Sequence, residues 1–163
     1  MRAPTLILLL AIALRGQAGA QTVAPKKIHA SVGRVFGAGT QVDTLSTAHG
    51  PVLRALRHDS LLGYAVVRDV RGKDQPITFL VAVDNAGRVL DVDILVYREP
   101  YGGEVVYESW RRQFRGRSAA DSVRLGRPIR NISGATISSN AVTLGVRAAL
   151  EDLAALRHDG VLR

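Results

Sequence analysis

Residues 130–143 read Arg-Asn-Ile-Ser-Gly-Ala-Thr-Ile-Ser-Ser-Asn-Ala-Val-Thr, a turn of small residues that leads into a long helical pattern. Apolar side chains beyond the turn recur with the 3.6-residue period of a helix that buries one face, at Val142, Val146, Ala149, Leu150, Leu153 and Leu156. We therefore expect a helix over residues 138–157, with Ser138 or Ser139 capping its first turn through a hydroxyl.

Thr136 stands at the N-terminus of that expected helix. Free backbone N–H groups and the positive end of the helix dipole make such a place receptive to phosphate. The turn Ser133-Gly134-Ala135-Thr136 is also narrow enough for backbone to approach a ligand. Taken alone, these four residues are more often only a helix cap, so the surrounding sequence has to decide between the two interpretations.

The longer context, from Ile132 to Ser139 and on to Gly145-Val146-Arg147, resembles the flavinylation motif of the FMN-binding domain family. That family includes flavin-carrying components of the sodium-translocating NADH:quinone reductase and of the Rnf complex. In its motif, the threonine after Gly-Ala carries FMN through a phosphoester bond that a dedicated flavin transferase makes. The resemblance covers roughly residues 60–157 and implies that Thr136 is the acceptor hydroxyl. Arg130 stands where the family commonly has aspartate.

The resemblance also implies a setting for the cofactor around Thr136. Gly134 and Ala135 leave room for the transferase and for the phosphate group. The hydroxyls of Ser133, Ser138 and Ser139 can donate to phosphate oxygens, with the amides of the helix behind them.

A second part of the implied site lies in the loop after the expected central hairpin. The family typically has Glu-Thr-Pro-Gly in this loop, which borders the flavin. Glu99 matches the acid, Gly102-Gly103 roughly match the glycine, and Pro100 stands where the family has threonine. Without the resemblance, the same residues would be read as an ordinary surface turn.

Strand periodicity dominates the sequence before that loop. Residues 61–69 are expected to form a first strand, and residues 77–83 alternate with the period of two of a strand with one buried face. A short hairpin loop at 84–88 then leads to a partner strand over 92–96. Asp91 and Asp93 share one side of this strand and are read as its solvated side, so no metal site is predicted.

A second helix is expected over residues 104–116, with Val106, Trp110 and Phe114 on its buried face. Its other face carries Arg111, Arg112 and Arg115, which are interpreted either as a solvated surface or as a docking surface for an acidic redox partner or a membrane. The predicted fold class is α+β, a single domain in which an antiparallel sheet is packed by the two main helices.

The chain is expected to begin with a signal peptide over residues 1–20, because Arg2 precedes an apolar run and a small-residue cleavage site. The run from Leu6 to Leu14 is shorter than the ~20 residues needed to span a bilayer. Residues 21–60 are expected to form an N-terminal extension with short helices, and residues 61–163 the FMN-binding domain. The expected location is periplasmic or secreted, with peripheral contact to a membrane as an option.

Composition restricts the chemistry further. The chain has no cysteine, which excludes disulfides, thiolate-held iron–sulfur clusters and c-type haem attachment. The net charge of +8 suits an acidic partner, an anionic membrane face or a phosphate-bearing cofactor. Nucleic acid is not expected as a partner, because the basic residues are scattered and lack aromatic platforms outside residues 107–117.

The function implied by the resemblance is that of an exported flavoprotein that carries FMN, covalently linked, and acts in electron transfer. Such a protein is a redox component and not a stand-alone catalyst, so no catalytic residues are assigned. Its expected partners are a flavin transferase and a redox donor and acceptor, which can be membrane-bound. Two alternatives remain open: a non-covalent phosphate- or nucleotide-binding module that uses the same turn, and a cell-envelope adaptor that has lost the cofactor.

Overall fold

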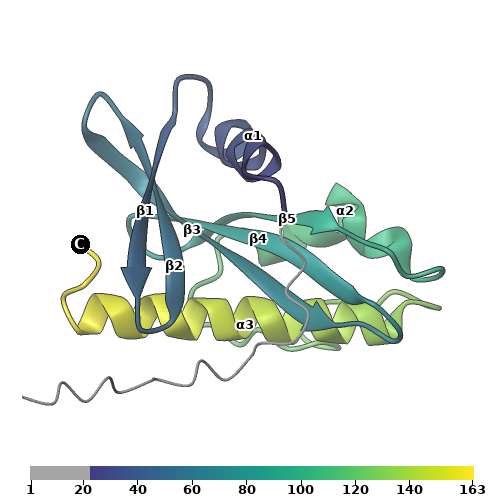
Figure 1. Ribbon diagram of the computed structural model, residues 1–163. Coiled ribbons are helices and arrows are strands. Elements are labelled where there is room, and N and C mark those ends of the chain that lie inside the picture. The colour runs from purple at the N-terminus through teal and green to yellow at the C-terminus, as the bar shows by residue number, and fades with distance from the viewer. Residues whose placement is uncertain (1–22) are drawn as a thin grey trace, which may run out of the picture.

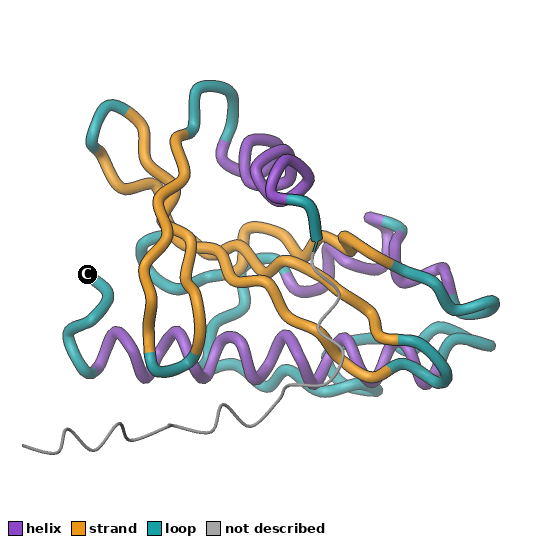
Figure 2. The backbone as a smooth tube through the Cα atoms, in the orientation of Figure 1, coloured by secondary structure: helices purple, strands orange, loops and turns teal. Residues whose placement is uncertain are grey.

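The computed structural model describes residues 23–163, which form a five-stranded sheet with helices on both faces (Figure 1). Each strand pairs antiparallel with the next one in the chain, so every connection within the sheet is a hairpin (Figure 2). The strands, in spatial and chain order, are β1 Gln41–Thr47, β2 Gly50–Arg57, β3 Ser60–Arg71, β4 Pro76–Asp84 and β5 Val89–Val96. The predicted α+β class is confirmed, and the predicted signal peptide lies outside the described residues.

Helix α3, Thr136–His158, covers one face of the sheet. Its apolar stripe meets β3 and β4 in a core that includes Phe79, Val81, Val142 and Val146. At Gly145 the helix comes closest, because a Cβ there would lie 2.5 Å from Val70 Cγ1 and 2.7 Å from Phe79 Cζ. The absence of a side chain at position 145 therefore sets how closely the helix sits on the sheet.

Helix α1, Pro25–Phe36, lies against the opposite face of the sheet. Val32 of this helix packs into a second cluster with Leu80, Ala82 and Leu95. As a result β4 is buried on both faces along nearly its whole length. The alternation in residues 77–83 predicted only one buried face, because the second layer comes from a helix that is distant in the sequence.

Residues 21–60 contain more of the sheet than predicted. One of the short helices expected there is present as α1, but β1 and β2 stand where further helices were expected. β1 has no fully buried residue, so it offers little of the apolar alternation that marks a strand in a sequence. Its place is fixed mainly by pairing with β2, which in turn pairs with β3.

The helix predicted over residues 104–116 is broken into three short pieces, η1 Gly103–Val106, α2 Glu108–Arg111 and η2 Arg112–Phe114. Tyr107 takes an extended conformation between the first two pieces, with φ −73° and ψ 135°. This break shifts the buried face, so that Val105 enters the core in place of Val106. Trp110 and Phe114 are buried as predicted, with their rings 5.3 Å apart in an edge-to-face pair.

The helix predicted over residues 138–157 is confirmed and begins at Thr136. Its N-cap is Ala135, which provides no side-chain hydrogen bond, so the predicted caps Ser138 and Ser139 are wrong. Both serines are already inside the helix and buried. Among residues 23–163, no helix combines the length and hydropathy that a bilayer span requires.

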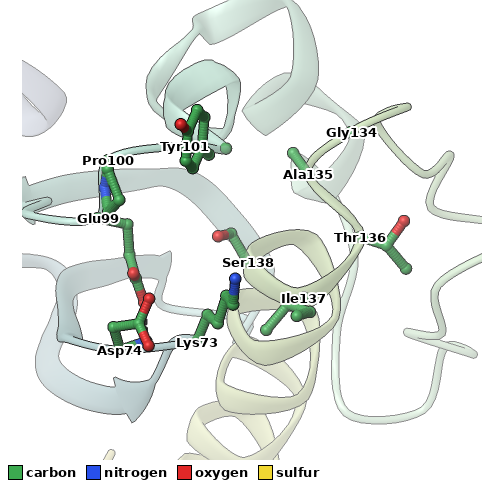
Figure 3. Close-up of a pocket in the computed structure, with 11 residues that line it drawn as sticks. Lys73, Asp74, Glu99, Pro100, Tyr101, Gly134, Ala135, Thr136, Ile137 and Ser138 are labelled. Carbon is green, nitrogen blue, oxygen red and sulfur yellow. Dashed lines mark hydrogen bonds between the residues drawn. The ribbon is translucent and has the colours of Figure 1, made fainter.

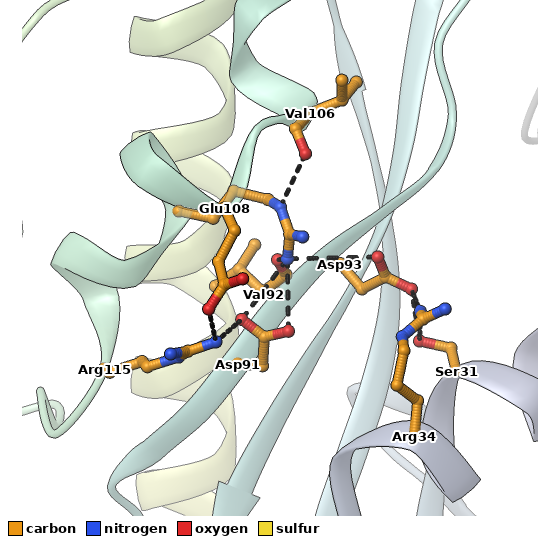
Figure 4. A network of polar contacts seen from close by, with 9 residues as sticks. Ser31, Arg34, Asp91, Val92, Asp93, Val106, Glu108 and Arg115 are labelled. Carbon is orange, nitrogen blue, oxygen red and sulfur yellow. Dashed lines mark hydrogen bonds and ion pairs between the residues drawn. The ribbon is translucent and has the colours of Figure 1, made fainter.

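The charges beside β5 are arranged differently from the prediction (Figure 4). Arg111 was expected on a solvated face, but its side chain is only 13% exposed and pairs with Asp91 at 3.2 Å. It also lies 4.0 Å from Asp93, which additionally accepts hydrogen bonds from Ser31 and Arg34. β5 is an edge strand, and α1 and α2 both pack against it. Their side chains cover the carboxylates of Asp91 and Asp93, which were expected to face water.

Gly145→Ala should lower the free energy of unfolding by about 1–2 kcal/mol, because overpacking in a filled core outweighs the gain in helix propensity. Gly33→Ala is the matched control, since position 33 is also helical and has nothing within 4 Å of a new Cβ. That variant should gain about 0.5–1 kcal/mol. Urea melts measure the free energy of unfolding of both variants. Equal stabilisation of the two would show that α3 does not touch the sheet at Gly145.

Trp110→Ala should cost about 3–5 kcal/mol as a large-to-small change in the core. Arg111→Ala should cost about 1–3 kcal/mol, because it leaves the covered carboxylate of Asp91 without its closest counter-charge. Arg112→Ala, the neighbouring exposed arginine, should stay within about 0.5 kcal/mol. If urea melts give the same loss for both arginines, the ion pairs of Figure 4 do not contribute to stability.

Candidate functional site

Three segments that are distant in the sequence enclose one open cavity of about 250 Å³ (Figure 3). The turn between β3 and β4 contributes Lys73 and Asp74, and the loop after β5 contributes residues 99–102. The start of α3 contributes residues 134–138. Five of the predicted site residues line this cavity, namely Glu99, Gly134, Ala135, Thr136 and Ser138.

Thr136 is the first residue of α3 and is exposed to solvent. Its hydroxyl oxygen accepts a hydrogen bond from Asn131 Nδ2 at 2.9 Å. The Asn131 side chain is fixed in turn, because its Oδ1 accepts from the backbone N–H of Ile132 at 2.8 Å. Figure 3 places Thr136 on the side of the cavity opposite Glu99. The hydroxyl is therefore both accessible and held beside a hydrogen-bond donor.

Backbone amides at the start of α3 are available to a ligand. The first bond of the helix runs from the N–H of Ser139 to the carbonyl of Ala135, at 2.9 Å. The N–H groups of residues 136–138 precede that bond and have no partner within the helix. Together with the positive end of the dipole of a 23-residue helix, they form a place that favours an anion.

The hydroxyl of Ser138 joins the helix to the loop after β5. It lies 2.9 Å from the Tyr97 hydroxyl, which donates to the carbonyl of Tyr101 at 2.5 Å. Gly102 has φ +82°, and a Cβ there would lie 2.8 Å from the Tyr97 oxygen and 2.9 Å from Ser138 Oγ. Burial raises the pKa of the Tyr97 phenol, and nearby carboxylates add to this effect, although the hydrogen bond with Ser138 acts in the opposite direction. The phenol therefore keeps its proton and remains a hydrogen-bond donor. Ser138 is thus engaged in holding the cavity wall.

Glu99 acts on the opposite wall. Its Oε1 accepts from the backbone N–H groups of Asp74 at 2.8 Å and Gln75 at 3.1 Å. Partial burial raises the pKa of Glu99, but these amide bonds and the charge of Lys73 outweigh it and leave the pKa below its ordinary value. The carboxylate therefore fastens the β3–β4 turn to the loop after β5 and is not free to bind a ligand with that oxygen.

Two predicted residues lie outside the cavity. Ser133 is exposed on the turn before α3, and Ser139 is fully buried with no hydrogen-bond partner for its hydroxyl. Ser139 follows Ser138 by about 100° around the helix, which turns it from the cavity towards the core. A role for Ser139 as a donor to phosphate does not agree with this orientation.

The sequence interpretation missed several residues that line or support the cavity. Lys73 and Asp74 arrive through the β3–β4 turn, and Tyr101 and Ile137 form its exposed apolar rim. The sequence shows Lys73 in a charged turn directly before a strand. Nothing in the sequence indicates that this turn lies next to the N-terminus of α3. Within residues 23–163, no cluster of three or more acidic, histidine or cysteine side chains could hold a metal ion.

The chain is similar to known proteins in sequence and to a solved structure in fold. Residues 72–151 match the sequence model of the FMN-binding domain family, and this stretch contains every residue that lines the cavity. A component of the proton-translocating ferredoxin:NAD(+) oxidoreductase complex of Clostridium ljungdahlii is 32% identical over 107 residues, 61% of this chain and 57% of that protein. The chain thus spans somewhat more than half of this relative.

The fold has a counterpart among solved structures. NqrC of Shewanella oneidensis superposes with a TM-score of 0.51 at 17% sequence identity, over 60% of this chain and 53% of NqrC. At this identity the likeness concerns the fold alone. Together with the family match and the relative from Clostridium ljungdahlii, it confirms the resemblance that the turn at Thr136 indicated.

The Glu99 contact gives a pH prediction. Because the pKa of Glu99 is lowered in the folded protein, its contribution to stability is complete above the ordinary titration range of glutamate and is lost as the pH falls through the lowered value. The amide resonances of Asp74 and Gln75 should titrate with that midpoint. Glu99→Gln should abolish this titration, whereas Glu104→Gln, an exposed control in η1 just after this loop, should leave it unchanged. A midpoint at or above the ordinary glutamate value would contradict the contact.

Proposed function

We propose that residues 72–151, which match the FMN-binding domain family, bind FMN with its phosphate at the N-terminus of α3. The observation that carries this proposal is the position of Thr136. Thr136 is an exposed residue that lines the cavity, at the start of a 23-residue helix and inside the matched stretch. The function we infer is that of a flavoprotein component of an electron-transfer chain.

The groups around Thr136 fit a phosphate monoester. The unpaired amides of residues 136–138 can donate to its oxygens, as at other helix N-termini. Asn131 already donates to Thr136 Oγ1 and can remain a donor when that oxygen becomes an ester oxygen. Lys73 supplies a positive charge on the cavity wall, and the nearby Glu99 carboxylate is engaged by backbone amides.

The size of the cavity suits part of the cofactor. Its volume of about 250 Å³ is below the ~300 Å³ at which pockets for small molecules usually begin. The phosphate and the polar chain next to it can enter, while a ring system has to use the rim. Tyr101 and Ile137 provide apolar surface there, with 79% and 53% of their surfaces exposed. Tyr101 can stack on an aromatic ring and Ile137 can pack on one.

We propose a covalent link at Thr136. A bond from Thr136 Oγ1 to the FMN phosphorus forms while a phosphoanhydride bond of an activated flavin nucleotide breaks. The hydroxyl proton passes to a base of the transferase, and the remaining nucleotide leaves with the bridging oxygen. The exposure of Thr136 supports this proposal, because the enzyme that performs the transfer must reach the hydroxyl.

Bound FMN accepts and donates one or two electrons, and the protein has to hold and orient it. The Tyr97 hydroxyl, Ser138 and Glu99 do this indirectly, since they fasten the three segments that form the cavity. The relative from Clostridium ljungdahlii is named as part of a proton-translocating oxidoreductase complex, and we propose redox partners in a membrane complex for the present chain as well. Export to the periplasm or the exterior is proposed from the predicted signal peptide, which precedes the described residues.

The test is covalent flavin on Thr136→Ala, produced together with an active flavin transferase. This variant should fold but show no flavin fluorescence in a denaturing gel and no mass increase for FMN, because the only acceptor oxygen has been removed. Ser133→Ala is the matched control, since Ser133 is a hydroxyl of the same turn that does not line the cavity. It should be labelled as the wild type is.

Other outcomes point to the alternatives. Flavin that persists on Thr136→Ala would place the link at another residue. Colour that is lost from the wild type on denaturation would indicate a non-covalent binding module. A folded wild type that takes up no flavin at all would indicate an adaptor that has lost the cofactor.

A further inference from the structure

A second hollow, of about 480 Å³, lies between α2–η2 and the segment that leads to Thr136. Arg112, Arg117 and Arg130 line it, and Trp110 and Gln113 form its inner wall. We call it the arginine hollow. Three of its lining residues are arginines, and none of the lining residues is acidic.

Hydrogen bonds hold the backbone beneath these arginines in place. The indole N–H of Trp110 donates to the carbonyl of Arg130 at 2.8 Å, and the N–H of Arg130 donates to Gln113 Oε1 at 2.8 Å. Arg117 donates from Nε to the carbonyl of Gln113 at 2.9 Å, which leaves its terminal nitrogens available. These hydrogen bonds fix the backbone of Arg130 against α2 and η2, so Arg112 and Arg130 line the same hollow although they belong to different segments.

The arginines of the hollow differ from their neighbours in their ion pairs. Arg111 pairs with Asp91, and Arg115 pairs with Glu108 at 2.8 Å. Within residues 23–163, none of the three hollow arginines takes part in an ion pair. Guanidinium groups match carboxylates in a bidentate geometry, and an anion placed among them would also relieve their mutual repulsion.

We propose that the arginine hollow is a docking surface for the carboxylates of an acidic protein segment. A protruding segment can enter a hollow, whereas a planar layer of lipid headgroups cannot follow its inner wall. None of the large exposed apolar side chains lines it, so it offers nothing to insert into a bilayer. Recognition through charge without apolar contact is typical of rapid, salt-sensitive association.

The position of the hollow relates it to the cavity at Thr136. Arg130 lines the hollow and Gly134 lines the cavity, so their Cα atoms can be at most about 14 Å apart even for an extended chain. A partner docked at the hollow would thus lie next to the cofactor site. That this partner exchanges electrons rests on the proposed function, whereas the binding of an acidic segment does not.

The experiment uses Trp110 as a local reporter, because it is the chain's one tryptophan and lies in the wall of the hollow. A short poly-glutamate peptide, titrated into the full chain, should shift the indole N–H resonance of Trp110 to saturation. Added salt should weaken the binding, and a poly-glutamine peptide should leave the resonance in place. These results require no flavin, so they remain interpretable if the proposed cofactor is absent.

Variants locate the effect. Arg112→Gln combined with Arg130→Gln should weaken the peptide's affinity by about tenfold or more. Arg71→Gln combined with Arg124→Gln removes the same charge from exposed positions outside the hollow and should weaken it by less than about threefold. An equal loss in both double variants, or an unshifted indole resonance, would overturn the proposal. Perturbation by phosphatidylserine-containing vesicles but not by the peptide would replace it with a membrane surface.

Discussion

The close contact of α3 with the sheet at Gly145 is the constraint on which the rest of the structure depends. With Val70 and Phe79 directly beneath the helix backbone, α3 has one position along and above the β3–β4 pair. Its N-terminus is then brought to the end of the sheet where the β3–β4 turn and the loop after β5 both emerge. The cavity exists because a helix end and two loops meet there, and the core contact decides that they meet.

The walls of the cavity are fastened by polar contacts that act at the loops. Tyr97 links the loop after β5 to Ser138 of α3, and Glu99 links the same loop to the turn that carries Lys73. Each contact uses a side chain of one segment and a group of another, so the three segments can keep their relative positions at the surface. In these contacts Ser138 and Glu99 hold the walls of the cavity, whereas the sequence predicted Ser138 as a donor to phosphate and Glu99 as part of a loop that borders the flavin.

The sequence was informative wherever a local pattern carried the signal. The apolar stripe of α3, the strands β3 to β5 and the small-residue turn at Thr136 could all be predicted in this way. β1 lacked a buried face of its own, and the burial of Asp91 and Asp93 depends on helices distant in the sequence, so neither could be foreseen. The break at Tyr107 was hidden because Trp110 and Phe114 keep helical spacing while Val105 replaces Val106. Lys73 meets α3 only through tertiary packing.

A shallow cavity and a covalent link are physically consistent with each other. Pockets that bind a ligand non-covalently usually have volumes of several hundred Å³ and bury most of the ligand's surface. Burial of that surface provides much of their affinity. A cavity of about 250 Å³ with exposed Tyr101 and Ile137 at its rim cannot bury a whole flavin nucleotide. If the phosphate is bonded to Thr136, retention no longer depends on buried area, and the ring can stay accessible at the surface. A protein that passes electrons to a docked partner needs such an accessible ring. Arg130 of the arginine hollow lies only a few residues before Thr136 in the chain, so a partner docked there would be close to the ring.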